Sequence, residues 1–172
     1  MRLLSVLACL VLSALVLAAP TTAARTTVAF EAKFNEGFGR ATAHPCPPSE
    51  TFSFCGEGTV AGFGRATTFS ELVSFSGTDE TGCGEAVFER TITFDDGSTL
   101  VLLETGTVCF PGESSTAPGS LKSFGNPFTF EGTFEVIGGT ETFKGATGTG
   151  TVVTRSAGDT GTSTLSGTLT LR

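Results

Sequence analysis

The sequence lacks the side chains on which most hydrolytic and group-transfer sites depend. It contains no tyrosine and no tryptophan, it has 16 phenylalanines, and its one histidine is His44. There is no G-x-S-x-G motif, so neither a serine nucleophile nor a nucleophile–base pair is supported. The cysteine spacings do not match C-x-x-C, and His44 stands in the proline-rich stretch H-P-C-P-P. We therefore expect no metal site and no cofactor.

Basic residues are scarce. The chain has 10 Lys and Arg against 17 Asp and Glu, a formal net charge of −7. Such a balance disfavours nucleic acid and anionic membrane surfaces as partners.

The amino-terminal segment reads as a secretory signal peptide. Arg2 precedes an uncharged run, Leu3 to Ala19, and small residues follow up to Ala24. We expect residues 1–24 to be removed, leaving residues 25–172 as one secreted, extracellular domain without membrane contact. A retained membrane anchor is the minority interpretation, because the run is at the short end of what a spanning helix needs.

Four cysteines remain after that cleavage, since Cys9 is the one of the five that lies in the leader. An even number in an exported chain favours two disulfides, with three possible pairings. The turn Asp95-Asp96-Gly97 between alternating apolar runs predicts a hairpin with Gly97 left-handed. In that register Cys83 faces Cys109, which predicts this disulfide. Proximity across the intervening loop predicts the second, between Cys46 and Cys55.

Beyond the leader the hydrophobic pattern has a period of two, which is typical of strands. The clearest example places Phe128, Phe130, Phe134 and Val136 on one face. Long loops are expected over Ala43–Gly56 and Phe110–Gly125. The expected strands are Thr26–Phe34, Gly58–Thr67, Phe69–Phe75, Glu85–Phe94, Thr99–Val108, Pro127–Ile137, Thr147–Arg155 and Thr162–Leu171. Eight short strands in one all-β domain predict an eight-stranded antiparallel barrel, with a β-sandwich as the alternative.

The motif G-F-G-R-A-T occurs twice, at Gly37–Thr42 and Gly62–Thr67, and a third Phe-x-Arg ends at Arg90. One interpretation is that Arg40, Arg65 and Arg90 together line an anion site. The other, which we favour, is a duplicated hairpin whose arginines pair with surface acids.

After the strand that ends at Ile137, the chain reads G-G-T-E-T-F-K-G-A-T-G-T-G-T. This segment resembles the G-G-T-G-x-F-x-x-A-x-G motif of dirigent proteins and allene oxide cyclases, and of secreted bacterial proteins with allene-oxide-cyclase-like barrels. The resemblance implies an antiparallel barrel, a homo-oligomer, commonly a trimer, and Phe143 as an anchor of the turn. Glu141 departs from the motif, which often has glycine there. The resemblance transfers no catalytic residue, because family sites use tyrosine and this chain has none.

The predicted hairpin register places Phe88, Arg90 and Glu104 on one face. If that face points into the barrel, Arg90 and Glu104 are diagonal neighbours in an apolar interior. A buried charge must be paired or must serve a ligand, so these residues are the candidate ligand-binding site, with Arg40 and Arg65 as further candidates. A structural ion pair, or a register that turns Glu104 outward, are the alternatives.

Three functions remain open. The first is a non-enzymatic barrel that binds a small apolar or carboxylate-bearing ligand, or a partner protein. The second is an isomerase or cyclase without covalent catalysis that guides a reactive substrate in the lumen. The third is a structural or inhibitory protein with a filled core.

Overall fold

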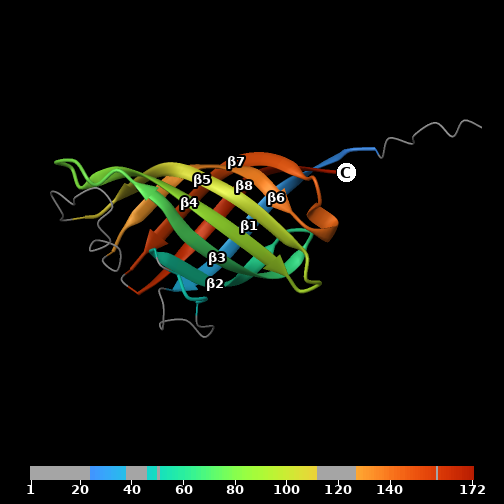
Figure 1. The fold of residues 1–172 in the computed structure, drawn as a ribbon, viewed down its shortest axis with the longest axis horizontal. Coiled ribbons are helices and arrows are strands. Elements are labelled where there is room, and N and C mark those ends of the chain that lie inside the picture. The colour runs from blue at the N-terminus through green and yellow to red at the C-terminus, as the bar shows by residue number, and fades with distance from the viewer. Residues whose placement is uncertain (1–23, 38–45, 50, 112–126, 158) are drawn as a thin grey trace, which may run out of the picture.

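The computed structural model describes residues 24–37, 46–49, 51–111, 127–157 and 159–172. These residues form a closed antiparallel barrel in which each strand pairs with the next, and β8 pairs with β1 (Figure 1). The elements are β1 (Thr26–Gly37), β2 (Ser53–Val60), β3 (Gly64–Phe75), β4 (Cys83–Phe94), β5 (Thr99–Cys109), β6 (Thr129–Gly139), the 3-10 turn η2 (Glu141–Phe143), β7 (Thr147–Ser156) and β8 (Thr160–Leu171). The predicted barrel is confirmed, and the sandwich alternative is wrong. Of the predicted signal peptide, only Ala24 lies among the described residues.

Alternation along the strands sorts side chains between the interior and the outer wall. On β6 the side chains of Phe130, Phe134 and Val136 are buried, and Phe128 just before the strand is buried too. The neighbouring outward positions are mostly threonine and glutamate, which tolerate water. The predicted inner face of this strand is therefore confirmed, and its beginning shifts from Pro127 to Thr129.

The β4–β5 hairpin has the predicted register. Phe88 pairs with Glu104, and Cys83 pairs with Cys109 at the far end. Gly97 has φ of 82°, and its N–H donates to the Phe94 carbonyl at 2.9 Å, which closes the turn. The Cα atoms of Cys83 and Cys109 are 4.1 Å apart and the two residues form a disulfide. Cys46 and Cys55 form the second, as predicted.

The boundaries predicted for the second and third strands are wrong. A turn at residues 61–63 interrupts the expected strand Gly58–Thr67, and Gly62 and Gly64 both have positive φ there. The Phe63 N–H donates to the Val60 carbonyl, which reverses the chain. Consequently β2 begins at Ser53, inside the expected loop Ala43–Gly56. The expected strand Gly58–Thr67 is divided between β2 and β3, and the expected strand Phe69–Phe75 lies within β3.

Phenylalanine rings close both ends of the barrel. At one end Phe143 of η2 stacks on Phe94, with centroids 4.6 Å apart, and also contacts Phe63. At the other end Phe110 packs between Phe75 and Phe128. The anchoring role expected for Phe143 therefore agrees with its position, and the middle of the barrel lies between two aromatic layers.

Candidate functional site

A charged cluster occupies the middle of the barrel. Arg90 on β4, Glu104 on β5 and Glu36 on β1 all point inward, and the Arg90 and Glu104 side chains have no exposed surface. The β4–β5 register makes Arg90 and Glu104 diagonal neighbours, as predicted. Glu36 lies on β1, and closure of the barrel brings it to the same level of the interior as Arg90 and Glu104.

The Arg90 guanidinium is held on several sides by groups of its own chain. Its Nε donates to Glu104 Oε1 at 2.6 Å, and Nη2 lies 3.5 Å from Glu104 Oε2. Its Nη1 donates to Glu36 Oε1 and, at 3.0 Å, to Thr68 Oγ1. Its Nη2 also donates to Ser163 Oγ at 3.3 Å. All three nitrogens of the guanidinium therefore have acceptors within the protein.

Buried hydroxyl groups extend the cluster. Ser163 donates to Glu36 Oε2, and its Oγ lies 2.7 Å from Thr154 Oγ1. Ser70 pairs with Arg90 across β3 and β4, and its buried Oγ has no hydrogen-bond partner among the residues that the structure describes. Buried polar atoms without partners are uncommon, so Ser70 is the incomplete part of the network.

Aromatic rings surround the charges. The Arg90 Cζ lies 5.4 Å from the ring centroid of Phe54 and 6.0 Å from that of Phe34. Phe88 packs edge-on against Phe54 and Phe130. These aromatic side chains exclude water, which strengthens each electrostatic interaction in the barrel interior.

The cluster contains two carboxylates and one cation, so Glu36 and Glu104 both pair with the single positive charge of Arg90. Burial lowers the pKa of Arg90, but Glu104 and Glu36 outweigh this effect, so its pKa stays above the ordinary value and the guanidinium is always charged. Burial raises the pKa of Glu104, Arg90 opposes this only in part, and the negative charge of Glu36 raises it further. The pKa of Glu104 therefore lies above the ordinary glutamate value although Arg90 pairs with it.

The predicted site residues do not all come together. Arg90, Glu104 and Phe88 are neighbours in the interior. Arg65 lies on the outer wall, where its Nη2 is 3.6 Å from Glu57 Oε2, so it does not join Arg90 in an anion site. Arg40 lies outside the described residues. The pairing of Arg65 with a surface acid agrees with the interpretation we favoured.

Glu36, Thr68 and Ser163 were missed by the sequence reasoning. Glu36 follows the inward residues Phe30 and Phe34 in the same period of two, so extending the first strand beyond Phe34 would have found it. Ser163 lies two residues before Leu165 on the inward face of β8, but its contact with Glu36 depends on the β1–β8 pairing and had no local signal.

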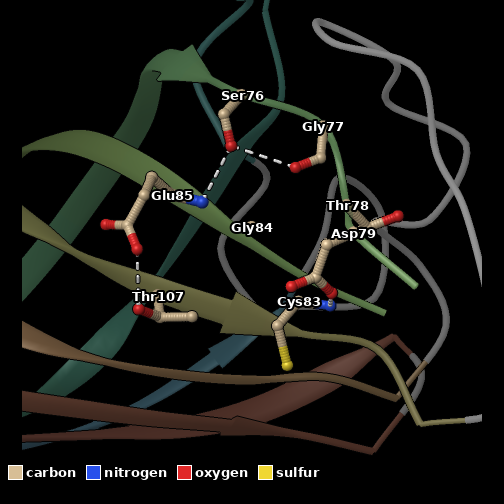
Figure 2. A pocket seen from close by; sticks show the side chains of 8 residues that line it. All are labelled: Ser76, Gly77, Thr78, Asp79, Cys83, Gly84, Glu85 and Thr107. Atoms are coloured by element: carbon tan, nitrogen blue, oxygen red, sulfur yellow. Dashed lines mark hydrogen bonds between the residues drawn. The ribbon is translucent and has the colours of Figure 1, made fainter. Parts of the chain in front are cut away.

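A second polar cluster lines a surface pocket of about 380 Å³ beside Cys83. Figure 2 shows Ser76 bonded to the Glu85 N–H and the Gly77 carbonyl, and Glu85 bonded to Thr107. Asp79 Oδ1 accepts from Thr81 and from the Cys83 N–H, and the Thr81 hydroxyl and N–H bonds lower the pKa of Asp79. These groups order the turn before β4, which positions Cys83 for its disulfide.

No group of three or more His, Cys, Asp or Glu suited to a metal ion occurs among the described residues. No helix in those ranges is both long and apolar enough to span a membrane. No family model, curated protein or solved structure matches the chain. The resemblance of the Gly138–Thr151 segment to the allene oxide cyclase and dirigent barrels stays a prediction.

Proposed function

We propose that this chain is an exported, non-enzymatic barrel protein that binds a partner protein through its outer wall. The observation that supports this most is the saturation of Arg90 by Glu36, Glu104, Thr68 and Ser163. The interior charges stabilise one another, which leaves the outer wall as the surface available for recognition.

Displacing these partners is costly. A ligand carboxylate that bound Arg90 would leave Glu36 or Glu104 buried without its cation. Breaking a buried ion pair in this way costs about 3–5 kcal/mol, which a small ligand must recover from other contacts. A partner on the outer wall meets no such penalty, because it leaves the buried ion pairs of Arg90 intact.

Site-specific photocrosslinking in the producing organism tests the proposal. Benzoylphenylalanine is placed singly at the exposed outward positions Val73, Ile137, Thr151 and Thr168, and buried Phe130 provides the control position. We expect adducts of defined mass from at least one outward position and none from Phe130. Absence of adducts from all four outward positions in the culture medium overturns the partner-binding function.

A second candidate is favoured by one specific observation. The unpartnered Ser70 Oγ and Glu104, whose pKa burial raises, lie in the same interior, so an oxygen atom of a small ligand would complete the network. This candidate covers both a bound carboxylate-bearing apolar ligand and the isomerase or cyclase alternative, in which Glu104 would supply a proton to a reactive substrate.

Fluorescence titration with cis-parinaric acid separates the two candidates. Under the first proposal the purified protein gives no saturable signal. Saturable binding that is lost in Ser70→Ala, a change that removes the hydroxyl and adds no atom to the buried site, replaces the first proposal with the second. Ser166→Ala, at an outward serine on β8, is the matched control and leaves the signal unchanged in either case.

A further inference from the structure

The exposed apolar side chains of the outer wall occur where the strand register shifts. The β3–β4 pairing slips between Leu72 and Ser74, and the intervening Val73 is 59% exposed. The β5–β6 pairing slips beside Val101, and Ile137 on the facing strand is 49% exposed. A β-bulge adds a residue to one strand and re-aims its side chain. At both shifts a large aliphatic side chain lies on the outer face, exposed to solvent.

Two further apolar residues connect these positions. Val87 pairs with Ser74, next to Val73, and projects outward between buried Ala86 and Phe88. Leu103 projects outward on β5, two residues along from Val101, and is half-buried. The four residues Val73, Val87, Leu103 and Ile137 step across β3, β4, β5 and β6, and we call them the apolar diagonal.

Folding does not account for the aliphatic character of this diagonal. Comparable outward positions on the same strands carry threonine, such as Thr91, Thr105 and Thr133, which is as β-branched as valine and better hydrated. Val73 and Ile137 bury too little of their surface to stabilise the barrel by much. Exposed apolar groups in a continuous series indicate an interaction site.

The charges beside the diagonal have one sign. Leu103 pairs with Glu89 on one side and with Glu135 on the other, and both carboxylates are exposed. Glu85 and Glu131 are also exposed on β4 and β6, whereas within the described strands β4, β5 and β6 the basic residue is Arg90, which points inward. A hollow of about 500 Å³ adjoins the diagonal, lined by Leu103, Thr133, Glu135 and Thr151 among others. The surface is therefore apolar with an acidic border.

We propose that the apolar diagonal docks a protein segment that carries aliphatic side chains flanked by lysine or arginine. This inference rests on the proposed function. It adds which face of the barrel binds the partner and which chemistry the partner carries. The basic groups of the segment meet Glu89 and Glu135, while its aliphatic groups cover Val73, Val87, Leu103 and Ile137. A second copy of the chain fits less well, because two identical acidic borders would face each other.

Peptide binding to the isotope-labelled full domain tests the inference. Two peptides of equal length and leucine content are used as probes, one patterned Leu/Lys and one patterned Leu/Glu. We expect the Leu/Lys peptide to shift backbone amide resonances in β3 to β6, and the Leu/Glu peptide to shift none. Val73→Thr combined with Ile137→Thr removes two exposed aliphatic contacts. This double variant should raise the Kd for the Leu/Lys peptide by about tenfold.

The matched control is Val153→Thr, an outward change of the same type on β7 that leaves every acidic residue of the border in place. We expect it to bind the Leu/Lys peptide as the unchanged protein does. Equal weakening by Val153→Thr would mean that the peptide binds apolar surface outside the diagonal, and no weakening by the double variant would mean that binding depends on net charge alone. Either result overturns the site. Concentration-dependent dimers that the double variant abolishes would overturn the basic segment in favour of a second copy.

The failure of this inference is distinguishable from the failure of the proposed function. Photocrosslinks at Thr168 alone, outside the hollow beside the diagonal, with no peptide binding at the diagonal leave partner binding intact and reject this face. Circular dichroism of each variant confirms that the barrel is folded before binding is measured.

Discussion

At the scale of single residues, Arg90 decides whether the interior charges are tolerated. It pairs with Glu104 and Glu36 and receives further acceptors from Thr68 and Ser163. Removing this one cation leaves two carboxylates in an apolar layer. Removing all three charged groups leaves none, and apolar replacement of a whole buried cluster is often neutral or stabilising.

We therefore expect Arg90→Leu to lower the free energy of unfolding by about 3–5 kcal/mol, measured by urea denaturation at neutral pH. The triple variant Arg90→Leu, Glu36→Leu, Glu104→Leu should recover most of that loss. If the triple variant is no more stable than Arg90→Leu, the loss comes from packing and not from unpaired charge.

Glu104 predicts an unusual dependence of stability on pH. Burial raises its pKa, so the folded protein keeps a proton that the unfolded chain has already released. Its contribution to stability is fully present below the ordinary glutamate range and is lost as pH rises through the raised pKa. Thr81 and Ser98 lower the pKa values of Asp79 and Asp96 by hydrogen bonding, so those two groups titrate below this window.

Urea midpoints measured from about pH 4 to about pH 8 should fall as pH rises, and Glu104→Gln should flatten this slope. Glu131→Gln is the control, since Glu131 is an exposed carboxylate near Arg155. An unchanged slope in Glu104→Gln would assign the pH dependence to other groups.

At the scale of secondary-structure elements, the turn between β6 and β7 stores a small strain. Glu141 has φ of 45°, in the left-handed region where a β-carbon crowds the backbone. Glycine lacks that atom, although it also gains more freedom when the chain unfolds. We expect Glu141→Gly to raise the free energy of unfolding by up to about 1 kcal/mol by urea denaturation. Glu135→Gly, inside β6, should instead destabilise the barrel.

The hairpin of β4 and β5 could be predicted because its turn and its register are local. Asp95-Asp96-Gly97 fixes one end, and the pairing of Cys83 with Cys109 then follows by counting. The boundary between β2 and β3 was missed because the expected strand Gly58–Thr67 was extended through the turn at residues 61–63. The turn depends on positive φ at Gly62 and Gly64, which the hydrophobic pattern does not encode.

The difference between local and long-range pairing also explains which residues of the candidate site could be predicted. Arg90 and Glu104 belong to one hairpin, so their proximity followed from its register. Glu36 and Ser163 come from opposite ends of the domain and meet only because β1 and β8 close the barrel. Long-range pairing of this kind has no local sequence signal, and the full network around Arg90 was therefore not predictable.

At the scale of the whole molecule, export stays a prediction that one measurement checks. Cleavage after Ala24 should yield a protein beginning at Arg25, immediately before β1, when chain from the culture medium is sequenced from its amino terminus. The disulfides Cys46–Cys55 and Cys83–Cys109 suit an oxidising compartment. Recovery of the intact amino terminus from the membrane fraction would reject cleavage.

The pairing of β1 with β8 also sets the order in which the barrel can be completed. It runs from Thr26 opposite Leu171 to Gly37 opposite Thr160, so the first strand made must wait for the last (Figure 1). Until then β1 has one free edge, and Glu36 lacks its bond to Ser163. Closure across the whole sequence is slow compared with hairpin formation. The hairpin of β4 and β5 can therefore bring Cys83 and Cys109 opposite each other before the barrel closes. A chain that stops short of β8 leaves an open sheet with an exposed edge that is prone to aggregate.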